Sequence, residues 1–210
     1  MQIAIVLFEH CTALDAVGPY EVFSRIPGAE VTMVGAEKGL VNTDTAMLRL
    51  HVDATFDEVG QPDIVVVPGG YGQRAHRAGS PLHSWLKKVD AHTSWTTSVC
   101  TGSLILASAG LLTGRRATTH WIACDDLAGY GAIPTEDRVV LDGKYVTAAG
   151  VSAGIDMALT LAASLGGEEL AQVIQLGIEY DPEPPFDTGS PRKAPQPAID
   201  MITAARDLIV

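Results

Sequence analysis

The clearest structural signal in this chain is a strand followed at once by a helix, in the sequence Ser-Trp-Thr-Thr-Ser-Val-Cys-Thr-Gly-Ser-Leu-Ile-Leu-Ala (residues 94–107). Its first half is rich in β-branched residues and predicts a strand over 94–99. Its second half has apolar residues at helical spacing and predicts a helix over 102–112. Cys100 stands where the strand ends, two positions before Gly102, which predicts a sharp turn of the nucleophile-elbow type. Such a turn projects the Cys100 side chain into a cleft.

The same alternation of strand and helix continues along the 210 residues. Several of the strand candidates are apolar on both faces, as buried parallel strands are. The pattern predicts an α/β protein with a doubly wound, mostly parallel sheet and helices on both faces. We expect strands at 2–8, 30–34, 63–67, 94–99, 116–119 and 145–149, and helices at 20–26, 81–91, 102–112, 122–128 and 153–165.

Four segments depart from this rhythm. We expect hairpins at 45–56 and 136–146, the second with Asp142-Gly143 as a type I′ turn. The proline-rich segment 181–197 predicts an extended arm, and 198–210 predicts a last helix. Because no linker divides the chain, we expect one domain over residues 1–210.

Charge and composition narrow the partners. The formal net charge is −11 and the basic residues are scattered, so the chain attracts neither nucleic acid nor anionic lipid. The apolar stretch 3–8 follows the first residues without a basic leader, and no apolar run approaches the roughly 20 residues that span a bilayer. We therefore expect a cytoplasmic protein that acts on a small molecule.

The cysteines Cys11, Cys100 and Cys124 form no C-x-x-C pair, which argues against disulfides and against a structural metal site. The N-terminus of the following helix favours a thiolate at Cys100, with a pKa below the roughly 8.5 of free cysteine. The alternative for Cys100 is a buried apolar filler. We interpret Cys11 and Cys124 as packing residues.

Asp15 is the candidate partner of Cys100. It follows the first strand and precedes Gly18-Pro19, where we expect a helix to begin. Between apolar stretches its charged form is costly, so it carries or shares a proton, as an acid–base group needs. The alternative is a helix cap. Glu21 is a rival carboxylate that we expect to face solvent or another subunit.

Backbone donors and a histidine complete the candidate set. Gly69 and Gly70 end the strand 63–67, and their N–H groups together with that of Thr101 could form an anion pocket over Cys100; a plain turn is the alternative. His120 follows the strand 116–119 and could orient or deprotonate the thiol, or be structural.

The segment Gly150-Val-Ser-Ala-Gly154 matches the serine-hydrolase pattern G-x-S-x-G. In that fold the histidine follows the serine, whereas all six histidines here precede Ser152. We interpret this segment as a close-packed turn between strand and helix.

Several motifs carry a family resemblance. Val-Cys-Thr-Gly-Ser (99–103), the run 63–70, Thr-Thr-His-Trp (118–121) and Gly-Val-Ser-Ala-Gly-Ile-Asp (150–156) resemble the ThiJ/PfpI superfamily, which is similar in fold to class I glutamine amidotransferases. Members are typically dimers with a cysteine at the elbow. The resemblance implies a homodimer, in which the arm at 181–197 is suited to cross between subunits.

The residues before Gly18 indicate a branch of this superfamily. The protease and deglycase branches carry a glutamate after the first strand, whereas this chain has Leu14-Asp15. Together with 97–104 and 179–186, this resembles the isonitrile hydratase branch, whose members hydrate an isocyanide to an N-substituted formamide. The resemblance places the functional groups on Cys100, Thr101 and Asp15. It implies a thioimidate on the cysteine, with no metal and no cofactor.

Other functions stay open on sequence alone. One is another thiol enzyme of the superfamily, an amidase, peptidase, glyoxalase or deglycase. Another is a noncatalytic ligand-sensing module. AraC-type regulators carry a similar domain joined to a helix-turn-helix region, which we do not expect in a chain that ends at Val210.

Overall fold

A parallel sheet forms the centre of the molecule in the computed structural model, which describes residues 1–77 and 79–210. Its strand order is β10-β11-β7-β6-β1-β2-β5, and only the pair β10–β11 is antiparallel among these described strands. The bounds are β1 (Gln2–Val6), β2 (Glu30–Gly35), β5 (Ala54–Thr55), β6 (Ile64–Val67), β7 (Trp95–Val99), β10 (Val139–Asp142) and β11 (Tyr145–Ala148).

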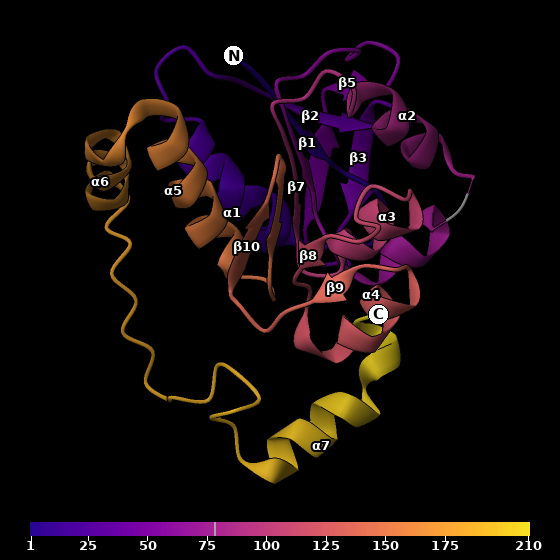
Figure 1. Ribbon diagram of the computed structural model, residues 1–210, viewed down its shortest axis with the longest axis vertical. Helices are drawn as coiled ribbons and strands as arrows, with labels where there is room; N and C mark the ends of the chain where they lie inside the picture. Colours follow the sequence, from indigo (N-terminus) through magenta and orange to yellow (C-terminus); the bar gives the residue numbers. More distant parts are fainter. Residues whose placement is uncertain (78) are drawn as a thin grey trace.

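Helices cover both faces of this sheet, as the sequence predicts (Figure 1). One face carries α1 (Ala13–Phe23) and α5 (Ala153–Gly166), and α6 (Glu168–Gly177) packs on α5. The other face carries α2 (Pro81–Val89), α3 (Gly102–Ser108) and α4 (Cys124–Gly129). The described chain has no helix with the length and apolar character needed to span a membrane.

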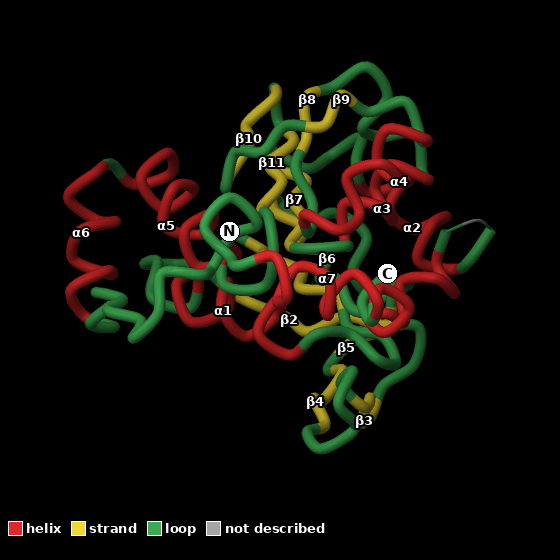
Figure 2. The backbone as a smooth tube through the Cα atoms, turned by 90° about the horizontal axis from the view of Figure 1, so that it is seen from below, coloured by secondary structure: helices red, strands yellow, loops and turns green. Residues whose placement is uncertain are grey.

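Smaller elements lie outside the central sheet. The hairpin of β3 (Gly39–Asn42) and β4 (Arg49–Val52) projects from it, as Figure 2 shows. A second small sheet pairs β8 (Arg116–Ala117) with β9 (Ile133–Pro134). The short 3₁₀ helices are η1 (Tyr71–His76), η2 (Trp121–Ala123) and η3 (Arg206–Leu208), and α7 (Gln196–Ala204) precedes the last of them.

The hairpin at 136–146 is confirmed, but its turn differs from the expected one. Asp142 pairs with Tyr145, so the two loop residues are Gly143 and Lys144 rather than Asp142 and Gly143. Gly143 has a φ of 64° at the first loop position, which is the glycine position of a type II′ turn.

Three other local predictions are wrong. The first hairpin covers 39–52 instead of 45–56, because residues 54–55 leave it and pair with β2. The strand predicted at 116–119 has only two residues and pairs outside the central sheet. The helix α6 was not predicted, although Glu168 and Glu169 suit the N-terminus of a helix.

The start of α1 also differs, and this change moves Asp15. The helix begins at Ala13 instead of residue 20, so Pro19 lies inside it and Asp15 lies in its first turn. Tertiary packing offsets the cost of the internal proline. Side-chain atoms of Pro19 and Val99 lie only 3.2 and 3.0 Å from where a Cβ on Gly154 would stand, so α1 and α5 approach closely at this point.

The start of α3 requires a residue without a side chain. A Cβ on Gly102 would lie 2.1 Å from the carbonyl oxygen of Val67 and 2.7 Å from that of Pro68. Gly102→Ala should therefore lower the free energy of unfolding by about 2 kcal/mol or more, measured by urea denaturation. Gly129→Ala is the control, because no atom lies within 4 Å of its Cβ position. Equal stabilities of the two variants would contradict this packing.

Candidate active site

Cys100 lies in a strained turn between β7 and α3. Its φ is 56°, in the left-handed region that costs a non-glycine residue about 1–2 kcal/mol. Its N–H donates to the carbonyls of Ala148 (3.1 Å) and Ala149 (2.9 Å). Its own carbonyl accepts the hydroxyls of Ser103 (3.2 Å) and Thr119 (3.0 Å). These hydrogen bonds hold the strained residue, as is common where strain serves a functional site.

Asp15 reaches from the first turn of α1 toward the end of β6. Its carboxyl is fully buried, and Oδ2 accepts the N–H of Gly69 at 2.8 Å. The second oxygen, Oδ1, has no hydrogen-bond partner among the described residues. One carboxyl oxygen therefore positions the group, while the other remains available for proton transfer.

Asp15 and Cys100 both lie against Gly69, whose N–H binds the carboxyl and whose Cβ position lies 3.0 Å from the Cys100 Cβ. Burial raises the pKa of Asp15 to about 8. The Gly69 N–H, which donates to the carboxyl, opposes this rise; the negative charge of Asp44 adds to the rise, and the neighbouring Cys100 thiol opposes it. Near neutral pH the carboxyl therefore carries its proton for most of the time.

The expected lowering of the Cys100 pKa is wrong. Burial, with the Asp15 charge second, raises the pKa of this thiol well above its ordinary value. The N–H groups of Thr101 and Val151 and the Thr101 hydroxyl act in the opposite direction. The helix behind the sulfur, α3, has only seven residues, and its dipole does not offset the loss of hydration. The resting pair is a neutral thiol beside a protonated carboxyl.

The two glycines after β6 position the site from within. The Gly69 N–H donates to Asp15 Oδ2, and the Gly70 N–H donates to Thr101 Oγ1 at 3.0 Å. These two donors are therefore used inside the protein, whereas the Thr101 N–H, the third donor of the predicted anion pocket, acts on the Cys100 sulfur. A Cβ on Gly69 would lie 2.5 Å from the Thr101 nitrogen and 3.0 Å from the Cys100 Cβ. Only glycine permits this approach.

His120 lies behind the site and is half-buried. Its Nδ1 accepts the N–H of Ile122 at 3.4 Å, so in the neutral ring the proton is on Nε2. Burial lowers the pKa of His120, which favours this neutral form. The ring packs against the backbone of Gly150, whose Cβ position lies 3.0 Å from Cδ2. His120 thus supports the turn that presents the Val151 N–H to the sulfur.

Sequence reasoning missed Val151 and Asp44. Val151 belongs to the G-x-S-x-G segment, which we interpreted only as a close-packed turn; the motif itself was the signal. Its serine, Ser152, accepts the Arg138 guanidinium at 3.1 Å. Asp44 lies in the β3–β4 connection, and its carboxyl accepts a hydrogen bond from the Thr12 hydroxyl at 2.7 Å. No local pattern shows that this loop approaches β1.

The other two cysteines and Glu21 complete the set of candidates. Cys11 is buried, and burial raises its pKa to about 11, with the charges of Asp15 and Asp44 adding to the rise. Burial also raises the pKa of Cys124, which is partly exposed. Glu21 is partly exposed and pairs with Arg25 at 2.5 Å. Among the described residues, no three His, Cys, Asp or Glu side chains are grouped as metal ligands.

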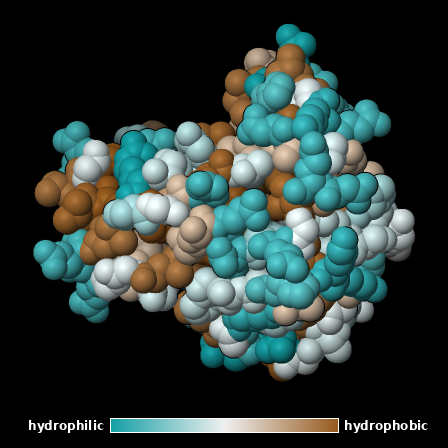
Figure 3. Space-filling view, turned by 90° about the horizontal axis from the view of Figure 1, so that it is seen from above, coloured by the Kyte–Doolittle hydropathy of each residue, from teal (hydrophilic) through white to brown (hydrophobic). Residues whose placement is uncertain are grey.

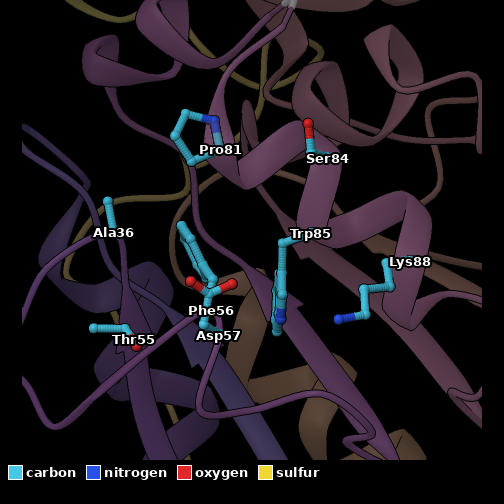
Figure 4. Close-up of a pocket in the computed structure, with 8 residues that line it drawn as sticks. All are labelled: Ala36, Thr55, Phe56, Asp57, Pro81, Ser84, Trp85 and Lys88. Atoms are coloured by element: carbon cyan, nitrogen blue, oxygen red, sulfur yellow. The ribbon is translucent and has the colours of Figure 1, made fainter.

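A separate cleft of about 280 Å³ lies beside α2 (Figure 4). The rings of Phe56 and Trp85 stack in it with centroids 5.0 Å apart, and the indole N–H of Trp85 donates to the Val59 carbonyl at 2.7 Å. It is lined by Ala36, Thr55, Phe56, Asp57, Pro81, Ser84, Trp85 and Lys88. The cleft shares no residue with the Cys100 site.

The fold and the site define a class of protein: an α/β protein with a cysteine and an aspartic acid paired at the carboxyl edge of a doubly wound sheet. The chain belongs to the DJ-1/PfpI family, whose model matches residues 1–164. The family resemblance stated from the motifs is thereby confirmed.

Relatives and solved structures agree with this assignment. The chain is 44% identical over 200 residues to an isonitrile hydratase of Pseudomonas putida, covering 95% of this chain and 87% of that one. It is similar to a THiJ/PfpI family protein of Pseudomonas syringae, with a TM-score of 0.94, 39% identity, and coverage of 97% and 85%. A match to the HTH-type transcriptional regulator CdhR of Pseudomonas aeruginosa has 35% identity, over 66% of this chain and 41% of that protein.

The raised pKa of Asp15 predicts a pH-dependent stability. The unfolded carboxyl ionises near its ordinary pKa of about 3.9, whereas the folded one stays protonated up to about pH 8. Between these values the unfolded chain binds fewer protons, so wild-type stability falls as pH rises. Asp15→Asn cannot ionise and keeps an oxygen for Gly69. From about pH 5 to about pH 7, the free energy of unfolding of Asp15→Asn minus that of wild type should therefore increase by up to about 1.4 kcal/mol per pH unit.

Asp57→Asn, at an exposed position, is the matched control and should track wild type at each pH. A constant difference between Asp15→Asn and wild type across this range would mean that the folded carboxyl is already ionised.

Proposed function

We propose that this chain is an isonitrile hydratase, a lyase that adds water to an isocyanide to give an N-substituted formamide, with Cys100 as nucleophile at a nucleophile elbow. The identity of 44% over nearly the whole chain to the Pseudomonas putida enzyme supports the assignment. The observation that carries it is the buried pair of Asp15, with a pKa of about 8, and the Cys100 thiol.

This pair suits the isocyanide carbon. The terminal carbon of R–N≡C has a lone pair that accepts a proton, and it becomes electrophilic when it does so. The reaction needs an acid and a nucleophile at the same atom. A carboxyl with a pKa of about 8 is an efficient acid near neutral pH. The thiol beside it supplies the nucleophile.

The first half of the reaction adds S–H across the isocyanide carbon. Asp15 gives its proton to that carbon, and the sulfur of Cys100 bonds to the same carbon. The thiol proton passes to Asp15, so the carboxyl is protonated again at the end. The product is the thioimidate R–N=CH–S–Cys100.

The second half adds water to this thioimidate. The water oxygen bonds to the carbon and the nitrogen takes up a proton, with Asp15 as the proton carrier. The C–S bond then breaks, the formamide leaves, and the hydroxyl proton returns to the sulfur. The N–H groups of Thr101 and Val151 and the Thr101 hydroxyl, which favour a negative sulfur, stabilise the departing thiolate. Covalent capture thus splits the hydration into two easier steps.

The shape of the site favours the hydratase over the other thiol enzymes of the family. Cys100 is only 2% exposed, so little room is available at its sulfur. An isocyano group suits such a site because it is linear and ends in the reacting carbon. An amidase, peptidase or glyoxalase acts on a trigonal carbonyl, which needs more room at the sulfur than a linear isocyano group does.

We further propose that the enzyme works in the cytoplasm, where its three free cysteines suit a reducing compartment, and that it forms a homodimer. Apolar side chains on α6 support the dimer: Val173 is 62% exposed and Leu176 is 80% exposed. Figure 3 shows hydrophobic residues gathered at the left end of the molecule, where Figure 1 places α5 and α6. The helix α7 has no buried residue, so it too has a face free for a partner.

Activity tests the proposed chemistry directly. With cyclohexyl isocyanide, wild type should produce N-cyclohexylformamide. Cys100→Ala should fall to the uncatalysed rate because no thioimidate forms. Asp15→Asn should lose about 10²–10⁴-fold in kcat, the usual contribution of a general acid. Cys124→Ala, the control thiol, should retain wild-type activity. Hydrolysis of amides or consumption of methylglyoxal without formamide production would refute the assignment.

Sedimentation tests the dimer. Wild type should sediment at twice the chain mass of 22.1 kDa. Leu176→Glu should shift the population toward the monomer, because it places a charge in the proposed interface. Met47→Glu is the matched control, since Met47 is 87% exposed on the β3–β4 connection. A monomeric wild type, or equal effects of both variants, would contradict an interface at α6.

A further inference from the structure

Two loops beside the site are joined by their backbones. The Thr12 N–H donates to the Gly69 carbonyl at 2.9 Å, and the Gly72 N–H donates to the His10 carbonyl at 3.3 Å. The first loop leads into Asp15, and the second begins with the glycine that binds its carboxyl. Any group fixed on these two loops is therefore fixed relative to the reacting carboxyl.

The side chains of His10 and Tyr71 form an aromatic pair on these loops. Their ring centroids lie 4.6 Å apart with an interplanar angle of 20°, so the rings are stacked. Tyr71 directly follows Gly70, whose N–H holds the Thr101 hydroxyl. Tyr71 is therefore bonded directly to the residue that positions the Thr101 hydroxyl.

Close backbone contacts hold the two loops under this pair together. His10 has a φ of 64°, a conformation uncommon outside glycine, and its N–H donates to the Asn42 carbonyl at 2.8 Å. Gly70 has a φ of 111°, and a Cβ there would lie 2.4 Å from the His10 carbonyl oxygen. Neither loop can shift alone without losing these contacts. Strain that the surroundings hold in place is typical of functional positions.

Exposure distinguishes the pair from the reacting groups. Asp15 and Thr101 are fully buried and Cys100 nearly so, whereas His10 and Tyr71 are each partly exposed. In the proposed reaction the isocyano group reaches the buried sulfur, and its organic substituent extends toward the partly exposed residues around the site. The stacked rings offer that substituent an apolar face fixed to the same loops as the acid.

We propose that His10 and Tyr71 form the specificity wall of the enzyme, on which the organic substituent of the isocyanide packs. This inference rests on the proposed function and deepens it, since it names the substrate class as isocyanides with bulky apolar or aromatic substituents. Aromatic faces bind such groups by offset stacking and by area burial. The pair positions substrate and takes no part in proton transfer.

The test compares benzyl isocyanide with methyl isocyanide, which lacks a substituent large enough to reach the wall. Tyr71→Ala should raise KM for benzyl isocyanide by about tenfold or more, as the loss of a hydrophobic contact does. Its kcat for both substrates and its KM for methyl isocyanide should stay at wild-type values. Tyr71→Phe, which keeps the ring, should restore wild-type KM.

His10→Asn is the second variant, because asparagine tolerates the positive φ while removing the ring. It should reproduce the selective rise in KM. An equal loss on both substrates would assign the pair a structural role and overturn the wall, as would no change on either. If wild type converts the isocyanides but the variants keep wild-type KM values, the specificity wall is ruled out and the proposed function is not. Wild type that converts neither isocyanide removes the proposed function and the wall with it.

Discussion

The hydrogen bond from the Gly69 N–H to the Asp15 carboxyl is the interaction on which the site depends. It joins the end of β6 to the first turn of α1, so that a carboxyl from one segment reaches a cysteine from another. It requires the absence of a side chain, because a Cβ on Gly69 would collide with Thr101. The N–H of the next glycine, Gly70, likewise donates to the Thr101 hydroxyl. A pair of glycines after one strand thereby fixes two of the three groups around the reacting carbon.

Burial then determines the chemistry. In water an aspartate beside a thiol would be ionised, and the acid needed for an isocyanide would be missing. Here the loss of hydration keeps both groups neutral, with the charge of Asp44 adding to the effect at Asp15. The Asp15 carboxyl, which must donate the proton, therefore carries it in the resting state. The donors around the sulfur become useful only when the thiolate leaves.

Residue patterns predicted the layers of the fold and the pairing of Cys100 with Asp15, because parallel strands bring their carboxyl-end loops together. They did not predict the state of that pair, since a pKa depends on burial in three dimensions. The start of α1 was wrong because a proline normally begins a helix, and only packing against α5 keeps Pro19 inside this one. Asp44 was missed because its approach to the site depends on tertiary folding alone, and Val151 was missed because the G-x-S-x-G segment was interpreted only as a close-packed turn.

The titration of the Asp15 carboxyl shows whether this group holds a proton for the isocyanide carbon. Carbon-13 NMR of protein labelled at the aspartate carboxyl carbons, with Asp15→Asn to assign the resonance, follows this one group through pH. The resonance should stay in the protonated position at neutral pH and titrate near a pKa of about 8. A titration near the ordinary value of about 3.9 would mean that no proton is available for the isocyanide carbon, and would rule out Asp15 as the acid.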